Sequence, residues 1–226
     1  MTVKYALFDF DGTLVDSNDA VINSLNHVAL AFRGHAFNKE ELNEILGKPI
    51  YEQMKFLSID EHERLVEMYR VEYRRVQDEL TKIYDGIYDM LIALKAMGIK
   101  TGIVSNKGRS GIDHGLIRFD LSEVIDVTVS YDDVVRAKPY ADGIYKALQL
   151  LGVEEASMKE ALHQTLFVGD SGHDLESARN AGCRSVLVAW TLIDMQQLMV
   201  LGPDHVVHHP DEIVALCERV PNASPE

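Results

Sequence analysis

The stretch YALFDFDGT, residues 5–13, joins a short apolar run to two aspartates and a glycine. Its first part, Tyr5–Phe10, predicts a buried β-strand because most of its residues are apolar or aromatic. Alternate side chains of a strand point to opposite faces, so Asp9 and Asp11 are expected on the same side. Gly12 lets the chain turn sharply, so that backbone N–H groups can approach a ligand. The stretch therefore predicts a strand that ends in a ligand-binding turn.

Similar apolar segments recur further along the chain and alternate with amphipathic ones. We predict further strands at Ile99–Val104, Val124–Val129, Thr165–Val168, Ser185–Ala189 and His205–Val207. The predicted helices are Ile87–Met97, Gly111–Arg118, Ala141–Leu151, Asp174–Ala181 and one from Pro210. Strands that alternate with helices of this length are typical of parallel βαβ units. The expected fold is α/β, with a Rossmann-like parallel sheet and helices on both of its faces.

Residues 16–84 break this alternation. Apolar residues recur there at helical spacing, with charged residues on the other faces and no strand-like run. We expect an inserted helical cap at 16–84 and a catalytic core made of residues 1–15 and 85–226. The tail from Pro221 is expected to fray.

Composition excludes several classes of protein. The 226 residues include 22 basic and 36 acidic ones, for a net charge of −14, which argues against non-specific nucleic-acid binding and a basic membrane-binding surface. Hydrophobic residues make up 46%, as in ordinary globular proteins, so an intrinsically disordered chain is excluded. Cys183 and Cys217 are too few for a disulfide framework or a zinc site. No targeting segment is visible, and Val186–Ile193 is far short of the ~20 residues of a membrane span. A cytoplasmic location is therefore expected, while the oligomeric state stays open.

Polar residues follow the predicted strands, where an open parallel sheet binds its ligands. They are Asp9, Asp11, Thr13, Ser105, Asn106, Lys138, Asp170 and Asp174. If these strand ends converge, the carboxylates repel one another unless a cation intervenes, and Mg²⁺ suits such an oxygen-rich site. Lys138, Thr13 and Ser105 supply donors for a phosphoryl group, and one carboxylate is then available to attack phosphorus.

The order of these motifs resembles a known family. Asp-x-Asp-Gly-Thr, then Ser-Asn, Lys-Pro and Gly-Asp-Ser-x-x-Asp are similar to the four motifs of the haloacid dehalogenase superfamily. The match runs from Lys4 to about Thr191, in the phosphatase branch that carries a helical cap between motifs one and two. One departure is visible at Ala141, where the family often has a second proline.

The resemblance implies a role for each motif residue. Asp9 would be the nucleophile and a Mg²⁺ ligand. Asp11 would be the general acid and base, with its backbone carbonyl on the metal. Two further roles concern the phosphoryl group: Ser105 and the backbone at Asn106 would hold its oxygens, and Lys138 would orient Asp9 and neutralise developing charge. Two concern the metal: Asp170 would bind Mg²⁺, and Asp174 would bind it directly or lie just beyond its ligands.

The function implied is Mg²⁺-dependent hydrolysis of a small phosphorylated metabolite through an aspartyl-phosphate. The runs from Thr13 to Ser17 and from Ser105 to Lys107 look most like phosphoglycolate phosphatases. A pyrophosphatase, a sugar-phosphate phosphatase or a β-phosphoglucomutase would share the same core motifs. A protein of another class, a phospho-accepting signalling module, also combines acidic residues with a lysine. The receiver domains of response regulators are of this kind, but they run to roughly 120 residues, whereas this chain has 226 and a helical insert after its acidic pair.

The leaving group is expected to be recognised by the cap. Lys48 follows Gly47 between two predicted cap helices, where related enzymes carry a substrate-specificity loop. We expect Lys48 to contact an anionic leaving group, with a solvated surface lysine as the alternative.

Overall fold

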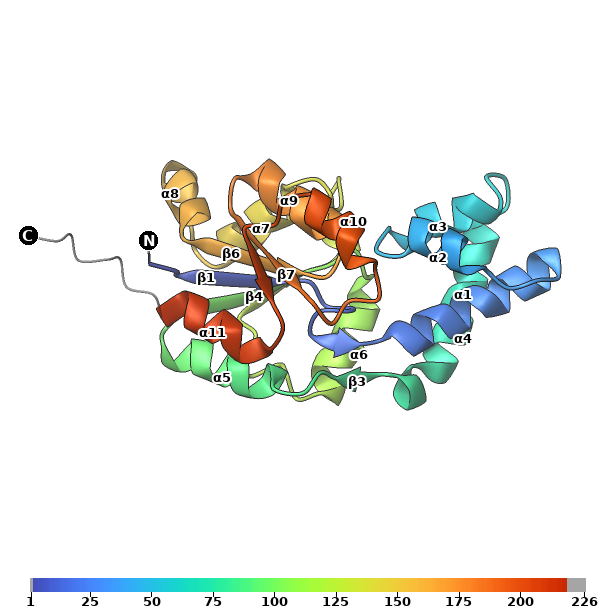
Figure 1. Ribbon diagram of the computed structural model, residues 1–226, viewed down its shortest axis with the longest axis horizontal. Helices are drawn as coiled ribbons and strands as arrows, with labels where there is room; N and C mark the ends of the chain where they lie inside the picture. Colours follow the sequence, from blue (N-terminus) through green and yellow to red (C-terminus); the bar gives the residue numbers. More distant parts are fainter. Residues whose placement is uncertain (1, 219–226) are drawn as a thin grey trace, which may run out of the picture.

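The computed structural model describes residues 2–218 of the chain, so the tail from Pro221 lies outside the described residues. Six strands form one sheet in the order β5-β4-β1-β6-β7-β8, and every neighbouring pair is parallel (Figure 1). Their bounds are β1 (Tyr5–Phe8), β4 (Lys100–Val104), β5 (Val127–Val129), β6 (Thr165–Gly169), β7 (Arg184–Val188) and β8 (His205–Val207). The predicted α/β fold with a parallel sheet is confirmed.

Each face of the sheet carries its own buried cluster, as the two-residue period of a strand requires. On β1, Ala6 and Phe8 belong to one cluster, and Leu7 between them belongs to the other. The first face is covered by α5 (Ile87–Ala96), α6 (Arg109–Arg118) and α11 (Pro210–Glu218). The opposite face is covered by α7 (Asp142–Leu150), α8 (Met158–His163), α9 (Gly172–Ala181) and α10 (Met195–Val200). All strand carboxyl ends thus point toward the same edge.

A separate group of helices stands beyond that edge (Figure 1). They are α1 (Asn18–Arg33), α2 (Lys39–Ile45), α3 (Ile50–Leu57) and α4 (His62–Leu80). They bury a cluster of their own, which includes Leu25, Val28, Met54, Leu65 and Val66. The long helices α1 and α4 pack along each other and carry most of this cluster.

Several details differ from the sequence-based expectations. The first strand ends at Phe8 rather than Phe10, because the Phe10 carbonyl accepts two hydrogen bonds from the following turn. The insert is not free of strands: β2 (Val15–Asp16) and β3 (Lys82–Ile83) pair antiparallel where the chain leaves and re-enters the core. The short helices α8 and α10 lie in segments where we predicted no element.

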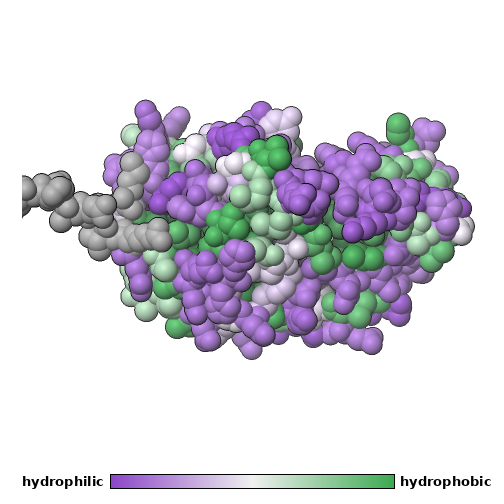
Figure 2. Space-filling model, viewed as in Figure 1, coloured by the Kyte–Doolittle hydropathy of each residue, from purple (hydrophilic) through white to green (hydrophobic). Residues whose placement is uncertain are grey.

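The surface is mostly polar. Figure 2 shows hydrophilic residues over much of the visible face, with apolar ones scattered between them, as expected for a chain with a net charge of −14. Among residues 2–218, no helix is both long and apolar enough to cross a membrane.

Candidate active site

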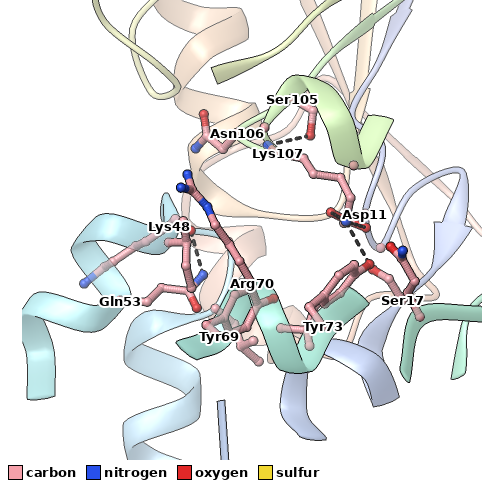
Figure 3. Close-up of a pocket in the computed structure, with 18 of the residues that line it drawn as sticks. Asp11, Ser17, Lys48, Gln53, Tyr69, Arg70, Tyr73, Ser105, Asn106 and Lys107 are labelled. Atoms are coloured by element: carbon pink, nitrogen blue, oxygen red, sulfur yellow. Dashed lines mark hydrogen bonds and ion pairs between the residues drawn. The ribbon is translucent and has the colours of Figure 1, made fainter. Parts of the chain in front are cut away.

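The loops after β1, β4 and β6 open into a cavity of about 560 Å³ between the sheet edge and the helical insert. Core residues Asp9, Asp11, Ser105 and Asp170 line one side. The other side comes from the insert and includes Lys48, Gln53, Tyr69, Arg70 and Tyr73 (Figure 3). Arg74 also lines this side. The predicted convergence of polar strand ends is therefore seen in the structure.

An acidic cluster lies at the floor of this cavity. One carboxylate oxygen each from Asp9, Asp170 and Asp174 lies within 4.8 Å of the others. Lys138 is buried among them, with its Nζ 2.8 Å from Asp9 Oδ1 and 2.6 Å from Asp174 Oδ1. Three carboxylates therefore share one ammonium group, so the cluster carries excess negative charge when they are ionised.

Burial shapes the proton affinity of this cluster. It raises the pKa of Asp9 to about 6, an effect that Lys138 opposes and Asp174 reinforces. Burial also raises the pKa of Asp170 well above its usual range, and the carboxylates of Asp174 and Asp9 add to the rise. A divalent cation would relieve the same repulsion. The donor set fits Mg²⁺, since it consists of three hard carboxylate oxygens within 4.8 Å of one another.

Asp174 has a second task besides its place in the cluster. Its Oδ2 accepts hydrogen bonds from the backbone N–H of Ser171 at 3.0 Å and from its hydroxyl at 2.6 Å. These bonds close a capping box at the start of α9. With Oδ1 on Lys138, both Asp174 oxygens are engaged, so this residue fixes Lys138 and the helix start together.

The turn after β1 brings Asp170 close to the backbone. Gly12 has a φ of 76°, a conformation that favours glycine. A Cβ at this position would lie 2.3 Å from Asp170 Oδ2. A glycine at this position therefore lets the backbone of the turn lie directly against the Asp170 carboxylate. Asp170 Oδ2 also accepts a hydrogen bond from the Thr191 hydroxyl at 3.2 Å.

The motif after β4 is tied to the Lys138 loop. The Asn106 side chain donates to the Lys138 carbonyl at 3.2 Å and accepts from its backbone N–H at 3.0 Å. Ser105 is buried at the cavity, and its hydroxyl accepts from the backbone N–H of Lys107 at 3.3 Å. The Asn106 side chain therefore serves to hold the loop that carries Lys138.

Two predicted site residues lie apart from the acidic cluster. Thr13 is buried but does not line the cavity; its carbonyl accepts from Trp190 Nε1 at 3.2 Å, and its hydroxyl has no hydrogen-bond partner within residues 2–218. Lys48 does line the cavity, and its backbone carbonyl accepts a hydrogen bond from Gln53 Nε2 at 2.7 Å. In Figure 3 its ammonium group points away from Asp11.

A further pair of residues at the site was not predicted. Lys107 Nζ lies 3.1 and 2.9 Å from the two carboxylate oxygens of Asp11 and 2.8 Å from the Tyr73 hydroxyl (Figure 3). Burial alone would lower the pKa of Lys107, but Asp11 and Tyr73 raise it above its usual value. The sequence signal that could have found Lys107 is its position directly after the Ser-Asn motif at a strand end.

With this geometry in place, comparisons with known proteins identify the family. The model of the haloacid dehalogenase-like hydrolases matches residues 6–188, which is most of the chain. The chain belongs to this family. It is therefore a hydrolase of the phosphatase type, as the motif order implied.

Individual relatives cover nearly the full chain. The pyrophosphatase PpaX of Bacillus mycoides is 30% identical over 220 residues, covering 97% of this chain and 99% of the relative. The PpaX of Bacillus thuringiensis strain Al Hakam is 32% identical over 216 residues, covering 96% and 97%. This member of the haloacid dehalogenase-like hydrolases thus has relatives that share its whole length.

Solved structures agree with the fold. A Lactobacillus plantarum protein assigned as a phosphoglycolate phosphatase superimposes with a TM-score of 0.83 at 25% identity, covering 96% of this chain and 100% of that one. A Thermotoga maritima protein assigned as a β-phosphoglucomutase gives a TM-score of 0.70 at 26% identity, with coverages of 95% and 98%.

Proposed function

We propose that this hydrolase is a Mg²⁺-dependent phosphatase of small phosphate monoesters, similar to phosphoglycolate phosphatases, and that it works through an aspartyl-phosphate. The observation that carries the proposal is the placement of Asp9. Its carboxylate lies at the floor of the cavity, 2.8 Å from Lys138 Nζ and within the acidic cluster that includes Asp170. These positions support Asp9 as the nucleophile, Lys138 as the cation that neutralises charge and Asp170 as a metal ligand.

In the first step, an Asp9 oxygen forms a bond to phosphorus while the bond from phosphorus to the leaving oxygen breaks. Asp11 gives its proton to the leaving oxygen, which departs as an alcohol or acid. Lys138 stays paired with Asp9 and Asp174 and keeps the nucleophile in line. Ser105, which is buried at the cavity, is the donor available to a phosphoryl oxygen.

In the second step, a water oxygen bonds to phosphorus as the bond from phosphorus to Asp9 breaks. Asp11 accepts the proton of that water, and inorganic phosphate leaves. Asp9 and Asp170 would hold Mg²⁺, together with the Asp11 backbone carbonyl, and Asp174 lies close enough to join them. When bound, the metal ion neutralises charge on the phosphoryl oxygens during transfer.

We further propose that residues 16–84 act as a cap over the core. The helices of this segment have their own buried cluster and supply one wall of the cavity. The chain passes between the core and the cap twice, along the paired strands β2 and β3, and this ribbon would serve as the hinge. Closure would exclude water during transfer from the substrate and reopening would admit it. A cytoplasmic location stays a prediction.

A second candidate is pyrophosphate hydrolysis, which would use the same core residues. It is favoured by the PpaX relatives, which are 30–32% identical over almost the whole chain. A sugar-phosphate phosphatase or a β-phosphoglucomutase-type enzyme would also share this core. Membership in a hydrolase family argues against a phospho-accepting signalling module.

The test is a panel of phosphate compounds assayed with the Asp9→Asn variant and a matched control. Phosphoglycolate, pyrophosphate, hexose phosphates and p-nitrophenyl phosphate are compared by kcat/KM, with Mg²⁺ and with EDTA. Asp9→Asn should abolish hydrolysis of every compound, whereas the exposed Asp113→Asn should not change it. Substantial turnover by Asp9→Asn, or turnover of the wild type in EDTA, would contradict the proposal.

A further inference from the structure

Lys107 occupies an unusual position between the core and the cap. Its ammonium group has three N–H donors. Three acceptors surround it: the two carboxylate oxygens of Asp11, at 3.1 and 2.9 Å, and the Tyr73 hydroxyl of α4, at 2.8 Å (Figure 3). Every donor of Lys107 and both oxygens of Asp11 are therefore engaged in this closed arrangement.

The surrounding fold makes room for this lysine. A Cβ on Gly111 of α6 would lie 2.7 Å from Lys107 Cε, so a larger residue at this position would push the Lys107 side chain aside. The Lys107 side chain is 13% exposed, and its Nζ lies 4.2 Å from the centre of the Tyr73 ring. Tyr69 stacks on Tyr73 at 5.8 Å and backs it from the same helix. Lys107 is thus held in a built site.

This arrangement places a condition on the substrate. In the first step Asp11 carries the proton that it gives to the leaving oxygen, so its protonated oxygen is no longer the charged acceptor that Lys107 has in the structure. Losing this acceptor leaves a mostly buried ammonium group short of a partner, which is costly. A leaving group with an anionic oxygen of its own replaces both the lost acceptor and its charge, whereas a neutral leaving group can replace it only with an uncharged acceptor.

The cavity offers a second positive charge for such a group. Arg74, one residue along α4 from Tyr73, also lines the cavity. Arg70 pairs with Glu67 at 2.6 Å, whereas Arg74 has no hydrogen bond or ion pair among the described residues. An anionic group that binds Lys107 in place of Asp11 would therefore lie against the side of the cavity that carries the unpaired guanidinium group of Arg74.

We propose that Lys107 determines leaving-group specificity by exchanging one Asp11 oxygen for an anionic oxygen of the substrate. The preferred substrates are phosphate esters or anhydrides whose leaving group carries a second negative charge, a carboxylate or a phosphate, close to the scissile oxygen. This inference rests on the proposed phosphatase activity. It assigns to Lys107 a contact with the leaving group and gives Tyr73 the role of a positioning residue.

The experiment compares 2-phosphoglycolate with its neutral amide, which has nearly the same shape. The ratio of their kcat/KM values is measured in each variant, and this ratio does not depend on the fraction of enzyme that is correctly folded. The wild type should prefer the charged ester by about tenfold or more, which corresponds to one added ionic contact of about 1.4 kcal/mol. Lys107→Met should remove most of this preference, mainly by lowering kcat/KM for the charged ester.

Two further variants separate charge from structure. Lys107→Arg keeps a cation and should retain part of the preference. Lys100→Met removes a lysine from the opposite end of β4, where it pairs loosely with Asp126 at 3.8 Å, and should leave the ratio unchanged. Tyr73→Phe keeps the Lys107 charge but removes the hydroxyl that positions it, so the ratio should fall between those of the wild type and Lys107→Met.

The possible failures are distinguishable. Equal kcat/KM for the two esters in a wild type that depends on Mg²⁺ would overturn the role of Lys107 alone. A full preference in Lys107→Met would overturn it as well. If the wild type hydrolysed neither these two esters nor any other compound of the panel, the proposed phosphatase activity would fall, and this inference with it.

Discussion

Replacing Lys138 by methionine tests whether the acidic cluster depends on its buried cation. The ammonium lies 2.8 Å from Asp9 Oδ1 and 2.6 Å from Asp174 Oδ1, and the three side chains are only 3%, 12% and 1% exposed. Removing one partner of a buried ion pair typically costs about 3–5 kcal/mol, because the remaining charge stays buried. Two carboxylates lose a partner here, so we expect a loss near the upper end, about 4–5 kcal/mol, in metal-free protein.

The loss should depend on pH in a defined direction. Burial already raises the pKa of Asp9 to about 6, and the pKa must rise further without Lys138. The folded variant then binds more protons than the unfolded chain, so its stability falls as the pH rises. We therefore expect a larger destabilisation at about pH 8 than at about pH 5, where the Asp9 carboxyl group is mostly protonated and costs less to bury.

The assay is urea unfolding in EDTA, followed by the fluorescence of Trp190, the single tryptophan of the chain. Lys100→Met is the matched control, since Lys100 is 58% exposed and such surface pairs contribute about 0–1 kcal/mol. A loss below about 1 kcal/mol for Lys138→Met at about pH 8, or a loss that grows toward acid pH, would refute the reasoning.

Three further predictions concern the metal, the core and the cap. Mg²⁺ should raise the melting temperature more at about pH 8 than at about pH 5, because it binds ionised carboxylates, and Asp170→Asn should abolish the rise; an equal rise at both pH values would contradict the site. Gly115→Ala should destabilise the protein by about 1–3 kcal/mol in urea unfolding, although alanine favours helices, because its Cβ would lie 2.4 Å from Phe10 Cζ; a gain in stability would show that the ring can move. Replacing residues 17–81 by Asn-Gly should leave a core that unfolds cooperatively, since β2 and β3 are paired in a register that a two-residue turn can close; a core that fails to fold would show that the cap is not a separate unit.

Much of the core could be predicted because its strands are short apolar runs that end at polar residues. The strand expected at His205–Val207 has the same bounds in the structure. The errors arose where local pattern is weak. The two-residue strands β2 and β3 are too short to show any periodicity, and their pairing depends on residues 15 and 83 meeting across the whole insert. The six-residue helices α8 and α10 are likewise shorter than a reliable helical pattern.

The candidate site divides in the same way. Asp9, Ser105 and Asp170 could be placed because each follows a strand, and parallel strands end at one edge. Lys107 and Tyr73 are 34 positions apart in the sequence. Lys107 follows β4 of the sheet, whereas Tyr73 lies on α4 of the helical insert. No sequence period determines which face of α4 turns toward the core, so this contact could be found only in the folded chain.

Two lysines at the site, the buried Lys138 and the mostly buried Lys107, explain how a chain with a net charge of −14 can hold an anion. Each of the aspartates proposed to do chemistry has its own lysine: Asp9 is paired with Lys138, and Asp11 with Lys107. The hydrogen-bond and ion-pair partners of Lys138 within residues 2–218 all belong to the core, so its removal should slow the hydrolysis of charged and neutral esters alike. Lys107 faces the cap and the leaving group, so its removal should change mainly the choice between esters. The two lysines act on different parts of the substrate, so their effects should be independent. The loss of preference for the charged ester caused by Lys107→Met should therefore be the same in the wild type and in a Lys138→Met variant that hydrolyses both esters more slowly.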